Sequence, residues 1–197
     1  MENSGCGTVV VGLGSPIMCD DAVGLRISGE IEKMGIPGVD CRQEAIGGLD
    51  ILPVIRGYEF AVIADAIQTM QFEPGTVMIF GERDFGEAVA GASCHDVNLP
   101  TAIKIGRQMD PSSMPAEIAF VAVEVQDIRT VSETMTPPVE EAVEKGKNAV
   151  LHLIEEFRKR KARDRSPRTS SCLFRESRCS CARDPECPRP RASRPPR

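Results

Sequence analysis

The sequence predicts an α/β fold: a single three-layer α/β/α domain whose mostly parallel, twisted sheet of about five strands is flanked by helices. Short apolar runs rich in β-branched residues alternate along residues 1–157 with segments of helical spacing. The runs lack a strict two-residue alternation, as expected of strands that are covered on both faces. Strands that alternate with helices favour βαβ units, and therefore a parallel sheet.

Five short runs are candidate strands. All of them are of ordinary strand length, and the second in chain order is the weakest candidate. In chain order they are Thr8–Leu13, Gly38–Gln43, Phe60–Ala64, Thr76–Phe80 and Ile118–Val123.

Four segments between and after these runs are candidate helices. In the first, Val23, Ile27 and Ile31 recur every four residues, which places them on one face. The last begins at Pro137-Pro138, as expected because proline is favoured in the first turn of a helix. The four segments are Ala22–Met34, Leu49–Arg56, Leu99–Gln108 and Pro138–Lys159.

Charge divides the chain near Arg158. Residues 1–157 hold 10 of the 24 Lys and Arg and 25 of the 29 Asp and Glu, a net charge of −15, whereas residues 158–197 carry +10. The acidic body argues against nucleic acid as a partner, because phosphate binding needs a basic face. The tail has six prolines and few aliphatic residues, so we expect a folded domain over 1–157 and a disordered tail over 158–197.

Location and cysteine usage give two further expectations. The N-terminus has no basic segment followed by an apolar run, and no stretch approaches the ~20 apolar residues of a membrane span, so we expect a cytoplasmic protein that does not contact membranes. The four cysteines of the body are interpreted as free thiols or small core residues. The tail cysteines at 172, 179, 181 and 187 lack CxxC pairs, which disfavours a zinc site.

Acidic side chains and one histidine follow three of the candidate strands. Asp20 and Asp21 come after the first strand, Asp65 ends "AVIADA", and His95 lies in "ASCHDVNLP" beyond the fourth. Sites of parallel α/β sheets form in the loops at the carboxyl ends of the strands. Asp20 is interpreted as the cap of the following helix, which leaves Asp21 without a structural duty. For Asp65, an anchor of a neighbouring loop and a ligand are both open.

The glycine turn after the first strand does not match a nucleotide-binding loop. A GxGxxG pattern fails at its third glycine, where Ile17 stands, and two carboxylates would crowd the position of a pyrophosphate. Asp21, Asp65 and His95 would instead form an open-sided metal site with oxygen and nitrogen ligands. Carboxylates there could also orient or deprotonate a water for hydrolysis.

Several motifs together resemble the hydrogenase maturation proteases. They are "GLGSPIMCDDAVGLRI", "IGGLDIL", "AVIADAI…PGTVMIF", "SCHDVNLPTAI" and "MTPPVEEAVEKGKNAV", and the resemblance runs from Thr8 to Phe157. It implies an endopeptidase, often classed as aspartic-type, that removes the C-terminal extension of the nickel-iron hydrogenase large subunit after nickel insertion.

The same resemblance assigns roles to residues. The family's metal-contacting positions fall on Asp21, Asp65 and His95, and the metal would be nickel carried by the large-subunit precursor rather than a permanent cofactor. Asp21 and Asp65 are also the candidate catalytic residues. A non-cleaving chaperone that checks the precursor for nickel is the alternative hypothesis, and a nucleotide-binding domain is a weaker one.

Overall fold

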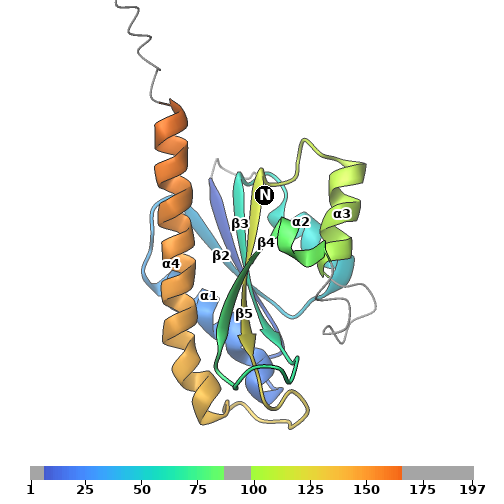
Figure 1. The fold of residues 1–197 in the computed structure, drawn as a ribbon, viewed down its shortest axis with the longest axis vertical. Helices are drawn as coiled ribbons and strands as arrows, with labels where there is room; N and C mark the ends of the chain where they lie inside the picture. The colour runs from blue at the N-terminus through green and yellow to red at the C-terminus, as the bar shows by residue number, and fades with distance from the viewer. Residues whose placement is uncertain (1–6, 87–98, 166–197) are drawn as a thin grey trace, which may run out of the picture. The chain divides into compact units, whose positions relative to one another are not determined.

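The computed structural model describes residues 7–86 and 99–165, which form one five-stranded sheet with helices on both faces (Figure 1). Three short 3₁₀ turns, Cys19–Ala22, Gly48–Asp50 and Glu82–Gly86, lie between these elements. The strands are β1 (Thr8–Leu13), β2 (Val39–Glu44), β3 (Phe60–Ile67), β4 (Val77–Gly81) and β5 (Glu117–Glu124). The helices are α1 (Val23–Lys33), α2 (Ile51–Ile55), α3 (Leu99–Met109) and α4 (Pro137–Arg165).

The strand order of the sheet is β2-β1-β3-β5-β4. Strands β2, β1, β3 and β5 are parallel, and β4 pairs antiparallel with β5 at one edge. The predicted fold class, with its mostly parallel five-stranded sheet, is confirmed. The four parallel strands end on the same side of the sheet, which we call the carboxyl edge, and their exit loops lie next to one another there.

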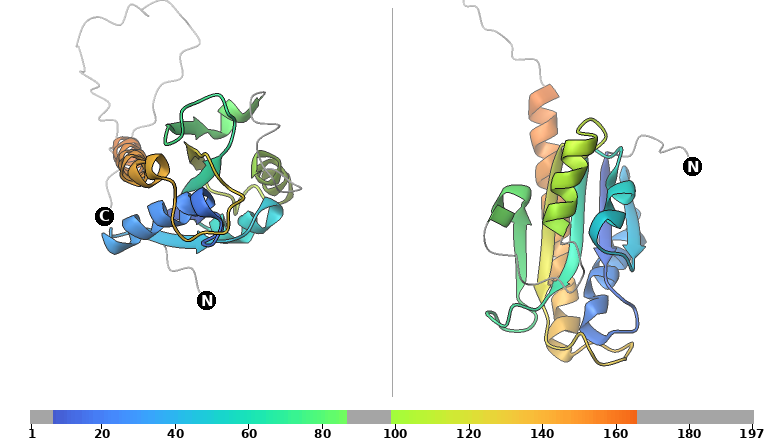
Figure 2. Two further views of the ribbon diagram at one scale, coloured as in Figure 1. Left: turned by 90° about the horizontal axis from the view of Figure 1, so that it is seen from below. Right: turned by 90° about the vertical axis from the view of Figure 1, so that its right-hand side faces the viewer.

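Each face of the sheet has its own core. Val10 and Val62 pack with helices α1 and α4, whereas Val9 and Ile63, which point to the other face, pack with α2 and α3. Figure 2 shows α4 and α3 on opposite sides of the strands. All four valine and isoleucine side chains are fully buried. The continuous apolar runs of β1 and β3 are therefore explained by burial on both faces.

Glycines let helix α1 lie unusually close to the sheet. A Cβ at Gly24 would stand 2.3 Å from the Leu13 carbonyl oxygen and 2.4 Å from the Ala64 carbonyl oxygen. A Cβ at Gly12 would stand 2.1 Å from the Gly24 carbonyl oxygen. The glycine turn thus serves close contact between helix and strands, and it brings the start of α1 against the carboxyl ends of β1 and β3.

Helix α4 ends later than the sequence indicates, at Arg165 rather than Lys159. Two of its basic residues pair with acids at the amino ends of strands: Arg160 lies 2.6 Å from Glu117, and Lys161 pairs with Glu59. These contacts stabilise residues that composition assigns to the tail. Residues 166–197, with the four tail cysteines, lie outside the described residues, so the expected disorder of the tail stays a prediction. None of the helices in 7–86 and 99–165 combines the length and apolar character needed to cross a membrane.

Candidate active site at the carboxyl edge

A cavity of about 310 Å³ opens at the carboxyl edge, to which the arrows of the four parallel strands point in Figure 1. The segments that follow β1 and β2 form most of its wall, together with Asp65 of β3 and the first residue of α3. Its lining residues are Leu13, Gly14, Ser15, Asp21, Ala45, Ile46, Gly47, Gly48, Asp50, Asp65 and Leu99. The structure therefore brings Asp21 and Asp65 together in one cavity. The third predicted site residue, His95, lies outside the described residues.

Asp21 is held by the backbone of the glycine turn. The Ser15 N–H donates a hydrogen bond of 2.7 Å to Asp21 Oδ2. Gly14 has a φ of +136° and passes so close that a Cβ there would lie 1.8 Å from the Asp21 carbonyl oxygen. The turn thus wraps around Asp21 and fixes its carboxylate at the cavity, in the place where a nucleotide-binding loop would hold a phosphate.

Asp65 lies near the end of β3, where the strand passes from the core into the cavity. Its Oδ1 accepts a 2.8 Å hydrogen bond from the Ala66 N–H. Removal from water raises the pKa of Asp65 to about 7, and the negative charge of Asp21 acts in the same direction, whereas the Ala66 hydrogen bond opposes the rise. A carboxyl group that is half ionised at neutral pH is suited to accept and return a proton.

Asp20 has a structural role, but the interpretation of this residue as a helix cap is wrong. Neither the 3₁₀ turn at Cys19–Ala22 nor helix α1 has a side-chain cap. The buried Asp20 carboxylate instead accepts hydrogen bonds from the backbone N–H groups of Gln126, Asp127 and Thr136, and from the Thr136 hydroxyl. It ties the start of α1 to the loop between β5 and α4. The two adjacent aspartates therefore have different roles: the Asp20 carboxylate anchors a loop inside the protein, and Asp21 lines the cavity.

The segment after β2 also lines the cavity, although the sequence predicted no site residue there. Ala45, Ile46, Gly47 and Gly48 form one side of the cavity, and Asp50 adds a third carboxylate to its lining. Gly48 has a φ of +57°, which glycine adopts without strain. The sequence feature that could have indicated this segment is the glycine pair in "IGGLDIL". It predicts a turn after a strand, but it does not indicate that the turn lines a cavity.

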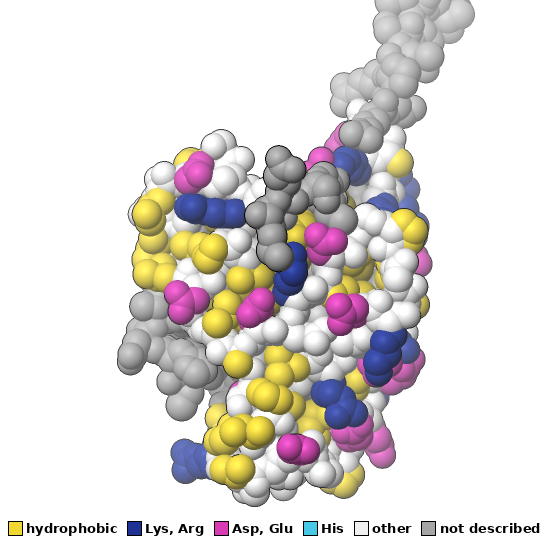
Figure 3. Space-filling model, turned by 180° about the vertical axis from the view of Figure 1, so that it is seen from behind, with side chains coloured by type: hydrophobic (Ala, Val, Ile, Leu, Met, Phe, Trp, Pro, Cys, Tyr) yellow, Lys and Arg dark blue, Asp and Glu magenta, His cyan; other side chains and the backbone are white. Residues whose placement is uncertain are grey.

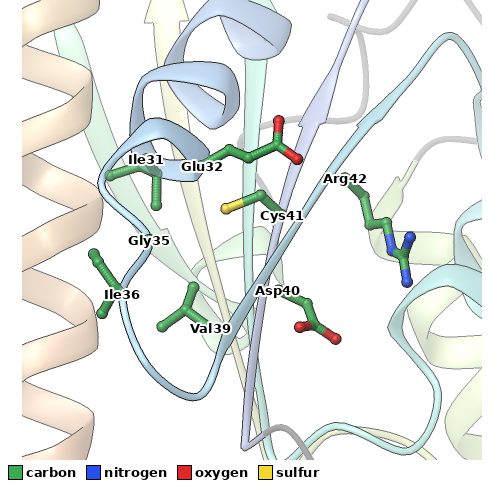
Figure 4. A pocket seen from close by; sticks show the side chains of 8 residues that line it. All are labelled: Ile31, Glu32, Gly35, Ile36, Val39, Asp40, Cys41 and Arg42. Atoms are coloured by element: carbon green, nitrogen blue, oxygen red, sulfur yellow. The ribbon is translucent and has the colours of Figure 1, made fainter. Parts of the chain in front are cut away.

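A second cavity, of about 270 Å³, lies between the end of α1 and the beginning of β2 (Figure 4). Figure 4 shows Cys41 pointing toward α1 and Glu32, while Asp40 and Arg42 point away from it. Burial raises the pKa of Cys41 to about 11, with Glu32 and Asp40 adding to the rise, so the thiol is un-ionised at neutral pH. This cavity holds no reactive thiolate, and it contains none of the predicted site residues.

Two of the four body cysteines and two of the three predicted metal ligands lie among the described residues. Cys19 and Cys41 are free thiols, as predicted, whereas Cys6 and Cys94 lie outside the described residues. Within the part of the chain that the structure describes, no three His, Cys, Asp or Glu side chains are grouped so that they could hold a metal ion. The predicted three-ligand site includes His95, so it stays a prediction.

Comparison with known proteins identifies relatives. A family model described as hydrogenase maturation protease matches residues 46–153. The hydrogenase 2 maturation protease of Escherichia coli (strain K12) is 25% identical over 151 residues, which cover 75% of this chain and 90% of that protein.

Solved structures show the same fold. The hydrogenase maturating endopeptidase HybD from E. coli aligns with a TM-score of 0.60 and 24% identity, over 76% of this chain and 92% of that one. The [NiFe] hydrogenase maturation protease HybD from Thermococcus kodakarensis aligns with a TM-score of 0.61 and 23% identity, over 74% and 97% of the two chains.

Proposed function

Because this chain belongs to the hydrogenase maturation protease family, and is therefore a peptidase, we propose that it removes the C-terminal extension of a nickel-iron hydrogenase large subunit after nickel has been inserted. The observation that carries this proposal is the pairing of Asp21 and Asp65 in one cavity at the carboxyl edge. The proposed substrate is the large-subunit precursor, and nickel belongs to that substrate.

Two carboxylates and an imidazole are a suitable ligand set for the substrate's nickel. Imidazole suits nickel, and carboxylates complete a mixed oxygen and nitrogen site with open positions for the ligands that the precursor supplies. His95 would be the third protein ligand. It precedes the cavity-lining Leu99 by four residues in the sequence.

Nickel recognition would make cleavage selective. A precursor without nickel would leave the carboxylates of Asp21 and Asp65 close together without a cation between them. Their mutual repulsion contributes to the raised pKa of Asp65, so a divalent cation that displaces the proton would relieve it. The loaded precursor therefore binds more tightly than the empty one, which is specificity by difference in affinity.

The hydrolytic step needs a water and a proton carrier. The water oxygen attacks the scissile carbonyl carbon, the C–N bond breaks, and the leaving amine takes up a proton. In the loaded complex the cation would displace the proton of Asp65, and the resulting carboxylate would accept a proton from the water and return it to the amine. Asp21 would bind the nickel of the precursor and so position the C-terminal extension for cleavage.

The test is to incubate the purified chain with nickel-loaded and nickel-free precursor and to determine the mass of each product. We expect loss of a C-terminal peptide from the loaded precursor alone. Equal cleavage of both samples would contradict nickel recognition. Binding of the loaded precursor without any loss of mass would contradict the proposed cleavage and favour the alternative, a chaperone that checks for nickel.

A further inference from the structure

Exposed apolar side chains are concentrated at the carboxyl edge of the sheet. Among the described residues, eight large hydrophobic side chains are exposed, and five of them lie on the exit loops of the parallel strands. Each of the four parallel strands is followed by a loop that carries at least one. The five are Ile17 after β1, Leu49 after β2, Met70 and Phe72 after β3, and Val131 after β5. In Figure 3 hydrophobic side chains are spread over the face that is shown, and some of them lie in its lower part, toward this edge.

Met70 is the most exposed of these side chains and has an unusual backbone. Its side chain is 86% exposed, and its φ is +59°. A non-glycine residue rarely adopts this left-handed region, because its Cβ comes too close to the following carbonyl oxygen. Such strain persists only where the surroundings enforce it, and it is concentrated at functional sites. Phe72, two residues later, is 51% exposed.

A buried glutamate enforces the conformation of residues 68–76, which we call the 68–76 loop. Glu124 is 1% exposed, and its carboxylate accepts hydrogen bonds of 2.8 Å from the N–H groups of both Thr69 and Met70. The Thr69 hydroxyl donates a third bond, of 2.7 Å. A buried carboxyl group is costly unless it is hydrogen-bonded, and here the donors that satisfy it are the groups of this turn, so Glu124 fixes the backbone at Thr69 and Met70.

The other end of the loop is held as well. The Gly75 N–H donates a 2.8 Å hydrogen bond to the Glu124 carbonyl oxygen. A Cβ at Gly75 would lie 2.3 Å from the Pro138 carbonyl oxygen, so the loop rests directly on the start of α4. The 68–76 loop is thus a preorganised structure that presents Met70 and Phe72 to the outside.

We infer that the 68–76 loop docks an apolar patch of the folded body of the large-subunit precursor, with Met70 as the central contact. This inference rests on the proposed function. When the C-terminal segment of the precursor enters the cavity of Asp21 and Asp65, the folded part of the precursor would lie against the exit loops at the carboxyl edge. The 68–76 loop is one of these loops, because it follows β3, the strand that carries Asp65. Preorganisation reduces the ordering cost of binding, and methionine adapts to irregular apolar surfaces.

A second copy of this chain is a less suitable binding partner for the 68–76 loop than the precursor is. Residues 1–157 carry a net charge of −15, so two such domains placed edge to edge would repel each other. Dimer formation through Met70 is therefore an outcome that the experiment must detect.

The experiment compares Met70→Asn with Met109→Asn, using the full chain and the nickel-loaded precursor. Asparagine tolerates the left-handed backbone, so Met70→Asn removes the apolar side chain without new strain. Met109 is 72% exposed at the end of α3, near the amino edge of the sheet, and serves as the matched control. We expect KM for the precursor to rise about tenfold in Met70→Asn with kcat unchanged, and to stay within twofold in Met109→Asn. Phe72→Asn should act like Met70→Asn.

Two readouts separate this inference from the proposed function. The affinity of the chain for the precursor is measured by titration independently of cleavage, so weaker binding by Met70→Asn supports docking even if no peptide is released. Equal KM and equal affinity for wild type and Met70→Asn would overturn the docking inference while leaving the proposed cleavage intact. A wild-type dimer that becomes monomeric in Met70→Asn, with unchanged affinity for the precursor, would also overturn it.

Discussion

Asp20 and Thr136 are 116 residues apart in the sequence and are joined by two hydrogen bonds. The Thr136 N–H donates to Asp20 Oδ1 at 2.6 Å, and its hydroxyl donates to Oδ2 at 2.9 Å. Thr136 stands directly before helix α4, and Asp20 stands directly before the cavity residue Asp21. The contact therefore couples the helix that covers one face of the sheet to the turn that builds the site.

Asp20→Ala should lower the free energy of unfolding by about 3 kcal/mol, because it leaves several buried N–H groups without an acceptor. Urea unfolding at neutral pH measures the loss. Asp110→Ala is the control, since the Asp110 carboxylate is exposed and its hydrogen-bond donors are the nearby Ser112 and Ser113. Its change in the free energy of unfolding should stay below about 1 kcal/mol. Equal losses in the two variants would contradict the anchoring role of Asp20.

Gly24→Ala should be strongly destabilising, by about 3 kcal/mol or more, because the new methyl group would stand 2.3 Å from the Leu13 carbonyl oxygen. Gly29 lies on the same helix, and a Cβ there would meet only Gln43 Nε2, at 3.8 Å. Gly29→Ala should therefore stabilise the protein by about 0.5–1 kcal/mol through helix propensity. Thermal unfolding of the two variants tests the close contact of α1 with the sheet, and a tolerated Gly24→Ala would disprove it.

Asp21→Asn and Asp65→Asn should each reduce cleavage of the loaded precursor at least 100-fold. The amide keeps the size of the side chain but removes the negative charge that would hold nickel, and at Asp65 also the group that would accept a proton in the proposed mechanism. Circular dichroism should show an intact fold in both variants, and Asp110→Asn should cleave at the wild-type rate. Wild-type processing by Asp21→Asn would refute the site assignment.

The contribution of Asp65 to the stability of the metal-free protein should fall as pH rises from about 4 to about 7. Burial raises the pKa of Asp65 to about 7, whereas an aspartate in an unfolded chain has a pKa of about 3.9. Between these values the unfolded state releases its proton first, so the folded state loses stability with rising pH. The loss levels off above about pH 7, and we expect it to reach about 2 kcal/mol after allowance for partial exposure.

Urea unfolding at pH 5 and pH 8 measures this slope in wild type and in Asp65→Asn. The variant has no titrating group at position 65, so its change in stability between the two pH values should be smaller by about 1 kcal/mol. Asp110→Asn should keep the wild-type slope, because hydrogen bonds from Ser113 and Ser112 lower the pKa of Asp110 and its proton is lost below pH 5. An identical slope in wild type and Asp65→Asn would show that Asp65 titrates normally.

The local pattern of apolar residues was sufficient to predict the strands and helices of the fold. The apolar runs at Thr8–Leu13 and Phe60–Ala64 predicted β1 and most of β3, because strands buried on both faces need nearly every residue to be apolar. The end of α4 could not be predicted from composition. Arg160 and Lys161 are typical of a solvated tail, and only the acids at the amino ends of the neighbouring strands show why the helix continues.

The sequence by itself determined the order of strands and helices, the family resemblance and the two acids of the candidate site, because these depend on residue type and spacing along the chain. Only the tertiary structure decided what each acid does. The sequence predicted a structural role for Asp20 as a helix cap, but the structure shows that it instead accepts hydrogen bonds from N–H groups of a loop more than 100 residues away, while Asp21 lines the cavity. The same holds for Glu124, whose role in shaping the turn at Met70 depends on a contact across 54 residues. Such roles are set by which distant groups the fold brings within hydrogen-bonding distance, and that information is not local to the sequence.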